Sequence, residues 1–397
     1  MYCFLSGGYN HGGGAQTIQL LLFKSLTKRG KKCKLFDVKD GSVHNAFLDT
    51  NIPFEFIEID EPRSKRDYSK CLNETDLLIV FDTNLFGNLL YFSRSKCKIL
   101  VWEIYYLWVE RFIYTKYFPL KWWALHQERK ILNEIVKNNA FFFIDYMGKE
   151  AVETRLNVSI SDNFYLPIPI EMPKCNKLIR QNLKSNLTVT YVGRSVIWKI
   201  NPFIKIASDF NEIGYLNSVN FIVVCDDIQK FKSELRKKLS FYDMLTIKFF
   251  ENLSLEQLNN SLEKSDLHFA MGTAALDGAK LGIPTIVVDG SFYDFPTNYR
   301  YRWIFETKEL NLGKALDYKE VQDVDGKHIL SEVLSTLKHN RNSISSKSFE
   351  YVKNNYDIEK VTDKIMAYEV SAQLTFASFN SMFIAKYFKM LRRLGIR

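Results

Sequence analysis

The first part of the chain alternates short, almost wholly apolar runs with longer amphipathic stretches. Such short runs predict strands of a parallel sheet buried on both faces, and the stretches between them predict helices. Residues 2–5, 15–29 (ended by Gly30) and 33–38 form a β-α-β opening. Further strands are predicted at 76–81, 98–102 and 140–144, with a long helix at 120–138 before the last strand. This pattern predicts a Rossmann-like domain over residues 1–170.

Residues 166–173 contain prolines at positions 167, 169 and 173, which exclude a helix and predict an extended linker. The alternation then resumes, with strands predicted at 187–192, 220–225, 245–250, 266–270 and 285–289. Ser254 and Gln257 have the spacing of a capping box on one of the helices between them. We therefore expect a second Rossmann-like domain at 171–345, with a helical pattern beyond residue 340.

Composition narrows the class of protein and of partner. The 397 residues are 46% hydrophobic and 25% charged, which is typical of a globular protein, and the net charge of +9 favours an anionic partner. The six cysteines show no CxxC pair, so neither a disulfide framework nor a zinc site is expected. No signal peptide and no apolar run of membrane-spanning length is visible, which predicts a cytoplasmic protein.

A pair of cations follows the strand predicted at 187–192. Gly193 would allow a tight turn at its carboxyl end, Arg194 comes next, and Lys199 lies five residues after the arginine. Asn201 and Pro202 resemble the N-cap and first residue of the following helix. Ligands of open α/β sheets bind beyond the carboxyl ends of strands, and an arginine fork with a lysine suits a diphosphate. Two solvated surface cations are the alternative interpretation.

Two further loops are candidates for ligand binding. Near the N-terminus, Gly13 and Gly14 belong to a glycine-rich loop between a strand and a helix, which can place backbone amides against an anion. The glycine spacing does not match a dinucleotide fingerprint, although Asp37 ends the second strand. In the second half, residues 272–284 form a loop and short helix, with Gly272 and Thr273 allowing close approach to a ligand. Asp277 could reach ribose or sugar hydroxyls, or be an ordinary helical carboxylate.

Together these motifs resemble GT-B glycosyltransferases, especially the family 4 (group 1) enzymes that build bacterial capsule and O-antigen. The matching segments are Gly13-Gly14-Ala15, the Gly193-Arg194 and Lys199 set, the Asp277, Gly282 and Pro284 set, and a closing helix around 354–361. The resemblance implies an α/β fold with two Rossmann-like domains facing each other across a cleft. It also implies a crossover helix at 346–370 that returns to the first domain.

The same resemblance implies a function. Sugar would be transferred from a nucleotide-diphosphate sugar to a saccharide acceptor, lipid-linked in surface polysaccharide synthesis, without a metal or other cofactor. Arg194 and Lys199 would bind the donor diphosphate together with Gly13, Gly14, Gly272 and Thr273, and Asp277 would bind the donor sugar and ribose.

One position departs from the family pattern. Many relatives carry a second glutamate eight residues before the acidic position, and here that residue is Phe269. The donor sugar and the stereochemical outcome therefore stay open. A catalytically inactive GT-B-like partner or scaffold in a polysaccharide-synthesis complex is the alternative function.

The general base and the acceptor site have weaker signals. Glu103, after the strand at 98–102, and His11, in the glycine loop, are candidate bases, and a helix-capping glutamate or a loop histidine are equally open interpretations. Asp82 and Asn84 follow another strand and are candidates for binding acceptor hydroxyls. We read Asp323 and Asp325 as surface charge rather than a metal site.

Two segments mix aromatic and basic residues. Residues 105–130 and the amphipathic tail at 371–397 have the composition of an interface with an anionic membrane surface, and packing against protein is the alternative. No nucleic-acid-binding motif accompanies them. The sequence thus leaves peripheral association with the inner face of the membrane open.

Overall fold

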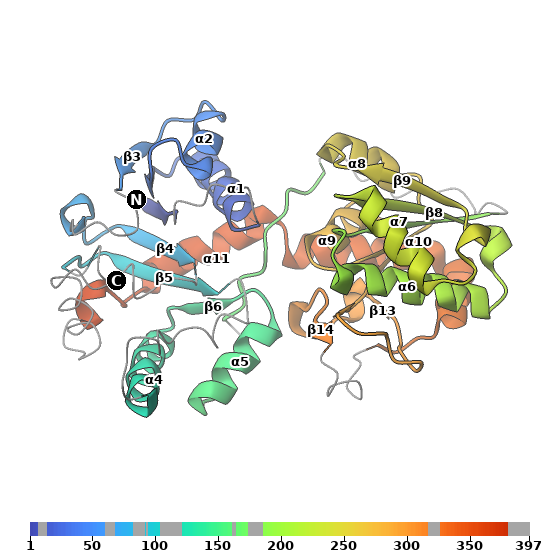
Figure 1. The fold of residues 1–397 in the computed structure, drawn as a ribbon. Coiled ribbons are helices and arrows are strands. Elements are labelled where there is room, and N and C mark those ends of the chain that lie inside the picture. Colours follow the sequence, from blue (N-terminus) through green and yellow to red (C-terminus); the bar gives the residue numbers. More distant parts are fainter. Residues whose placement is uncertain are drawn as a thin grey trace. The chain divides into compact units, whose positions relative to one another are not determined.

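The computed structural model describes residues 1–6, 14–59, 68–81, 92, 94–103, 121–160, 164–173, 186–316 and 326–379. The chain forms two compact units (Figure 1). Unit 1 comprises Met1–Glu171 and Tyr356–Arg397, and unit 2 comprises Met172–Asn355.

Unit 1 is built on a parallel sheet with the strand order β3-β2-β1-β4-β5-β6. The strands are β1 (Tyr2–Leu5), β2 (Cys33–Asp37), β3 (Glu55–Glu58), β4 (Leu77–Phe81), β5 (Lys98–Glu103) and β6 (Phe141–Phe143). The apolar runs of β1, β2, β4 and β6 are buried along their whole length, as the sequence predicts. The sequence analysis missed β3, which lies at the sheet edge with exposed glutamates at both ends and so lacks a continuous apolar run.

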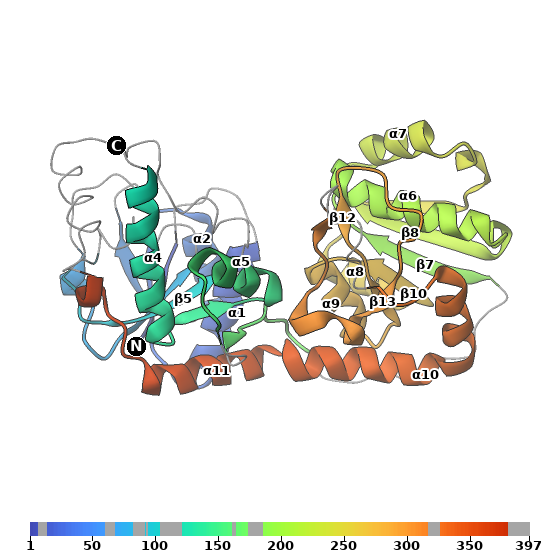
Figure 2. The ribbon, with the colours of Figure 1, turned by 90° about the horizontal axis from the view of Figure 1, so that it is seen from below.

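The helices of unit 1 are α1 (Gly14–Lys28), α2 (Ser42–Leu48), α4 (Lys121–Lys137), α5 (Tyr146–Leu156) and α11 (Ile358–Ser371), with short 3-10 helices η1 (Ser69–Cys71) and η10 (Phe376–Phe379). Helix α11 comes from the far end of the sequence and packs on the sheet beside α1 (Figure 2). The Tyr368 hydroxyl of α11 donates to the carbonyl of Ile99 in β5 (2.7 Å), and its ring contacts Phe142 of β6. Helix α11 is therefore part of this core.

Unit 2 repeats the architecture with the strand order β13-β11-β10-β7-β8-β9, in which only the β11–β13 pairing is antiparallel. The strands are β7 (Leu187–Val192), β8 (Val219–Cys225), β9 (Ile247–Glu251), β10 (Leu267–Ala270), β11 (Thr285–Val287) and β13 (Arg302–Trp303). A separate two-stranded ladder joins β12 (Gly290–Ser291) to β14 (Ala315–Leu316).

The helices of unit 2 are α6 (Ile197–Glu212), α7 (Ile228–Lys238), α8 (Leu255–Leu262), α9 (Thr273–Ala279) and α10 (Leu330–Asn355), with 3-10 helices η6 (Leu216–Ser218), η7 (Tyr242–Met244), η8 (Ile304–Glu306) and η9 (Lys308–Leu310). Figure 2 shows α6 and α7 on one face of this sheet and α10 on the other. The predicted capping box is confirmed, because Ser254 and Gln257 each bond the other's backbone N–H.

The predicted start of α6 is wrong. The helix begins at Ile197, and the Val196 carbonyl already accepts from the amides of Lys199 and Ile200 (2.8 and 3.0 Å). Pro202 therefore lies inside the helix, where it withholds only the hydrogen bond that the Trp198 carbonyl would accept. Asn201 is buried rather than capping, because its side chain reaches a loop far away in the sequence.

The linker predicted at 166–173 is extended, and its first residues are hydrogen-bonded within unit 1. The Leu166 amide donates to Phe143 (2.8 Å), and Ile170 exchanges backbone hydrogen bonds with Tyr356 and Ile358 (2.8 and 2.9 Å). The chain therefore leaves unit 1 and returns to it at neighbouring positions. The helix predicted at 346–370 corresponds to the end of α10 and most of α11.

Candidate functional site

The loop after β7 places Arg194 at the carboxyl edge of the unit 2 sheet. The Gly193 amide donates to the Val224 carbonyl (3.1 Å), which ties the loop to the neighbouring strand β8. Gly193 does not adopt the left-handed conformation that a glycine turn would use. A Cβ there would lie 3.0 Å from the Tyr191 ring, so glycine is favoured by close packing rather than by the turn that the sequence suggested.

Ser195 holds this loop against the end of β8. Its hydroxyl donates to the Asp227 carbonyl (2.7 Å) and accepts from the Asp227 amide (3.1 Å), and its own amide donates to the Asp226 carboxylate. Burial raises the pKa of Asp226, but the hydrogen bonds from Ser195 and the nearby Arg194 guanidinium outweigh it and keep that pKa below its usual value. The backbone beneath Arg194 is thus fixed while its side chain is exposed.

Lys199 lies in the first turn of α6 and shares this environment. Its ammonium is 5.0 Å from the centroid of the Trp198 ring, a cation–π distance. Burial lowers the pKa of Lys199, the Arg194 charge lowers it further, and Asp226 opposes both. Arg194 and Lys199 are therefore near enough for the charge of one to affect the pKa of the other, with the Asp226 carboxylate beside them.

Trp198 packs against a glycine of the separate β12–β14 ladder. A Cβ on Gly290, the first residue of β12, would lie 2.3 Å from the Trp198 ring. Asn201 fixes the same loop by donating to the carbonyls of Ser291 and Tyr293 (2.9 and 3.1 Å). Residues of the β12 loop thus contact both Trp198 and Asn201, the neighbours of Lys199 in α6.

Gly272 connects β10 to α9 in a conformation that only glycine adopts readily, with φ 63° and ψ −142°. Its amide donates to the Leu312 carbonyl (2.7 Å). The sequence predicted that backbone amides at Gly272 and Thr273 contact the donor diphosphate. In this structure the Gly272 amide is already used, so its contribution to the site is the shape of the backbone.

Asp277 lies one turn into α9 and is half-buried. Its carboxylate forms an ion pair with Lys280 (2.6 Å), three residues further along the same helix. The Lys280 side chain is 11% exposed and the Asp277 side chain is 22% exposed. Because both are largely covered, the ion pair holds the Asp277 carboxylate in one orientation.

A buried network at the end of β11 was not predicted. Asp289 accepts two hydrogen bonds from the Arg302 guanidinium (2.8 and 2.7 Å), one from the Tyr299 hydroxyl (3.1 Å) and one from the Lys314 amide (3.0 Å). Burial raises the pKa of Asp289, but the Arg302 charge outweighs it and holds that pKa below its usual value. An aspartate at the end of the strand predicted at 285–289 was the sequence signal, and its partners are 10 to 25 residues away.

Comparison with known proteins gives structural matches only. No protein-family model and no curated protein matches the sequence. A glycosyltransferase from Rickettsia africae ESF-5 superposes with a TM-score of 0.60 at 12% identity, covering 93% of this chain and 97% of that chain. A UDP-forming α,α-trehalose-phosphate synthase from Burkholderia xenovorans superposes with a TM-score of 0.56 at 10% identity, covering 94% and 99%.

This chain has the GT-B fold. The predicted fold class of two Rossmann-like α/β domains with C-terminal helices is confirmed. At such low identity the likeness establishes the fold alone, and the chemistry has to be argued from the residues.

Phe269, the departure from the GT-B sequence pattern, belongs to the core. It lies in β10, is fully buried, and packs edge-on against Tyr301 with ring centroids 5.5 Å apart. Only Met271 and Gly272 separate β10 from α9, so the loop is short and Phe269 cannot face a ligand from it. Phe269 therefore presents no polar group at the sheet edge of this GT-B chain.

Glu103 is the last residue of β5 and is fully buried. Its carboxylate lies against the first turn of α5, where a Cβ on Gly148 would be 2.2 Å from Oε2. Asp145 caps the same helix by accepting from the amides of Met147 and Gly148 (3.0 and 3.4 Å), and burial raises its pKa to about 6. Glu103 is thus buried against α5, whose cap is Asp145, and this placement does not suit a base open to an acceptor.

Asp37 also has a structural role. The carboxylate accepts from the amides of Val38 and His44 (2.9 and 3.2 Å) and packs against Gly41 at the start of α2. It is fully buried, so it does not present a carboxylate to a ribose as the acidic residue of a dinucleotide fold would.

Several predicted residues lie outside the described part of the chain: His11, Gly13, Asp82, Asn84, Asp323 and Asp325, together with residues 104–120 and 380–397. Gly14 is described as the first residue of α1. Within the described ranges, no three acidic, histidine or cysteine side chains gather as a metal site would require. In the same ranges, no helix has both the length and the apolar character to span a membrane.

Proposed function

We propose that the protein is a glycosyltransferase that moves a sugar from a nucleotide-diphosphate sugar to a saccharide acceptor. The observation that carries this proposal is the pairing of Arg194 and Lys199 at the carboxyl edge of the unit 2 sheet, on a backbone fixed by Ser195. This edge is where open α/β sheets bind ligands. The GT-B fold raises the expectation by analogy, because the two superposed proteins above are named as a glycosyltransferase and a UDP-forming synthase.

The chemistry of the step suits these residues. When the bond between the sugar and the diphosphate breaks, negative charge develops on the departing nucleoside diphosphate. An arginine fork and a lysine held nearby stabilise that charge, and they act without a metal in the proposed mechanism. Asp277, oriented by Lys280, is assigned to hydroxyls of the donor sugar or ribose.

The acceptor is assigned to unit 1. We propose that Asp82 and Asn84, after β4, bind its hydroxyls, and that it is a lipid-linked saccharide of bacterial surface polysaccharide synthesis. His11 is the better candidate for a general base, because Glu103 is buried against α5. Leu374, Phe376 and Phe379, at the start of the predicted tail, are buried in unit 1 rather than free to meet a membrane. We propose that an anionic membrane surface, contacted through residues 380–397, would bring the enzyme to such an acceptor.

A ligand-induced shift of the melting temperature tests the proposal. UDP, GDP, CMP, dTDP and their common sugar conjugates would be screened against the wild-type protein and an Arg194→Ala, Lys199→Ala double variant. A Lys248→Ala, Lys264→Ala double variant removes the same charge from exposed positions at the amino ends of β9 and β10. A shift kept in this control and lost in the site variant supports the proposal and identifies the nucleotide.

The competing function is a GT-B scaffold without activity, which is favoured by the buried Phe269 in place of a glutamate. A scaffold needs no diphosphate site. If no nucleotide shifts the melting temperature of the wild-type protein, the transferase proposal fails and the scaffold becomes the better account.

A further inference from the structure

His268 is a buried histidine between the two segments assigned to the donor. It lies in the middle of β10, next to β7 in the sheet and beneath α9, and it is fully buried. Its Nδ1 lies 3.2 Å from the carbonyl oxygen of Thr190 in β7, and its Nε2 lies 3.0 Å from the carbonyl oxygen of Ala274 in α9. One side chain therefore reaches both elements.

Each element leads directly to residues of the proposed site. Thr190 is followed within β7 and its loop by Gly193 and Arg194, and Ala274 stands between Thr273 and Asp277 in the short helix α9. The imidazole thus links β7, which leads to Arg194, to α9, which carries Asp277. These are the residues assigned to the donor diphosphate and to the donor sugar or ribose.

The imidazole ring packs closely against the backbone of α9. A Cβ on Gly278 would lie only 2.3 Å from the His268 Cδ2 atom, so the helix backbone rests directly on the imidazole. A neutral imidazole donates through one nitrogen only. It therefore forms a hydrogen bond with one of the two carbonyl groups and only packs against the other. Burial lowers the pKa of His268, which favours this neutral form.

We propose that His268 is a positioning residue of the donor site, which sets the place of α9, and with it Asp277, relative to the Arg194 loop. The inference rests on the proposed function. Arg194 and Lys199 bind the diphosphate, and the sugar is bound only when α9 lies at the correct distance from them. His268 therefore matters more for a nucleotide sugar than for the nucleoside diphosphate alone.

Three variants separate this role from a general role in the core. His268→Leu removes both polar contacts, while His268→Gln retains one donor that can reach the Ala274 carbonyl. Phe269→Leu is the matched control, because Phe269 is the next residue of β10, is equally buried, and points to the opposite face of the sheet against Tyr301.

Calorimetric titration with UDP and UDP-glucose, or with the equivalent pair selected by the thermal screen, measures the ratio of the affinity for the nucleotide sugar to that for the nucleoside diphosphate. In His268→Leu we expect affinity for the nucleotide sugar to fall about tenfold, or about 1.4 kcal/mol, with less than about a threefold change for the nucleoside diphosphate. His268→Gln should lie between this variant and the wild type, and Phe269→Leu should leave the ratio of the two affinities unchanged. Equal losses for both ligands, or the same ratio in His268→Leu and Phe269→Leu, would overturn the inference.

Hydrogen exchange supplies a readout that needs no ligand. We expect His268→Leu to accelerate exchange of the α9 amides well beyond the effect of Phe269→Leu. Unchanged exchange in α9 overturns the positioning role by itself, whereas failure of the wild-type protein to bind any nucleotide overturns the proposed function.

Discussion

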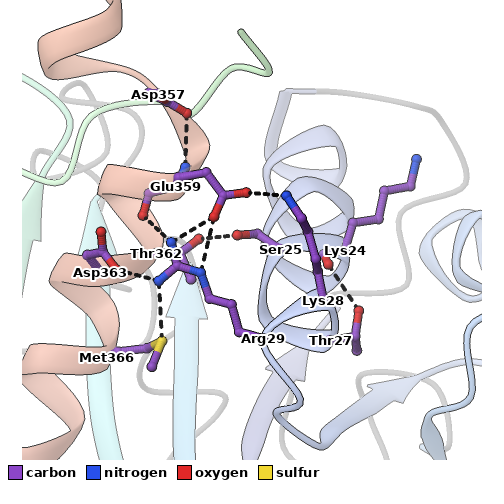
Figure 3. Close-up of polar contacts among 10 residues, drawn as sticks. All are labelled: Lys24, Ser25, Thr27, Lys28, Arg29, Asp357, Glu359, Thr362, Asp363 and Met366. Atoms are coloured by element: carbon purple, nitrogen blue, oxygen red, sulfur yellow. Dashed lines mark hydrogen bonds and ion pairs between the residues drawn. The ribbon is translucent and has the colours of Figure 1, made fainter. Parts of the chain in front are cut away.

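The Arg29 guanidinium donates hydrogen bonds to both the side-chain carboxylate and the backbone carbonyl of Glu359, 330 residues further along the chain (Figure 3). Both contacts are 2.8 Å long. The guanidinium also contacts Asp363, and the Thr362 hydroxyl donates to Ser25 (2.9 Å) in a buried position. These contacts attach α11, the helix with which the chain re-enters unit 1, to the end of α1.

We expect Arg29→Ala to lower the free energy of unfolding by about 1–2 kcal/mol, because a partly buried, charge-assisted set of hydrogen bonds is lost. Lys28→Ala is the control, since Lys28 forms an ion pair with the same Glu359 carboxylate but is 75% exposed, and such pairs contribute about 0–1 kcal/mol. Urea denaturation measures both values. Equal losses in the two variants would show that the guanidinium geometry is unimportant.

Gly272→Ala should affect both stability and ligand binding. A Cβ has free space there, so the cost arises from the backbone conformation alone and should be about 1–3 kcal/mol. Gly214→Ala is a matched control, because Gly214 also has a positive φ of 68° with open space around it but lies in the turn after α6. Only Gly272→Ala should weaken nucleotide binding in the thermal-shift assay, and a wild-type ligand response in this variant would contradict the placement of the site.

Arg302→Met should be one of the most destabilising single changes in unit 2. It leaves the Asp289 carboxylate buried without its counter-ion, which costs about 3–5 kcal/mol. The double variant Asp289→Leu, Arg302→Met removes both charges and should be less destabilised than Arg302→Met alone. Guanidinium chloride denaturation would compare them, and a double variant less stable than the single one would refute this account of the pair.

The same pair predicts a response to acid. The pKa of Asp289 is lower in the folded than in the unfolded chain, so its contribution to stability is present above the unfolded value of about 3.9 and is lost as the pH falls below it. The wild-type protein should therefore lose stability between about pH 4 and 2 more steeply than the double variant. If the stability of the two proteins fell in parallel with pH, the Asp289 carboxylate would not be the cause of the acid response.

Asp145→Asn should stabilise the protein at neutral pH. Burial raises the pKa of Asp145 from its usual 3.8 to about 6, so ionisation of the folded protein costs stability as the pH rises through this window. Asparagine retains the cap of α5 without the charge, and we expect a gain of about 1–2 kcal/mol at pH 7 that disappears at pH 4.

Asp227→Asn changes an exposed cap of α7 in the same way and serves as the control, with little change expected at either pH. Thermal denaturation at pH 4 and pH 7 measures both variants. A gain from Asp145→Asn that is the same at the two pH values would exclude ionisation as its cause.

Local sequence patterns were enough to predict the two α/β repeats, most buried strands, the capping box at Ser254, and the position of Arg194 and Lys199 after a strand. These features depend on neighbouring residues, because hydrophobic periodicity and cap spacing are properties of short segments. The edge strand β3 and the two-residue strands β12, β13 and β14 were not predictable, since they are too short or too exposed to show a buried pattern.

Contacts between side chains that are distant in the sequence could be seen in the three-dimensional structure alone. Asn201 has the sequence of a helix cap, yet it is buried because the β12 loop offers it carbonyl groups. Asp289 pairs with Arg302, and His268 contacts both β7 and α9. These contacts form because the order of the strands in the sheet places β13 beside β11 and β7 beside β10. Such contacts depend on three-dimensional packing and cannot be predicted from a local sequence pattern. They determine the geometry of the candidate site.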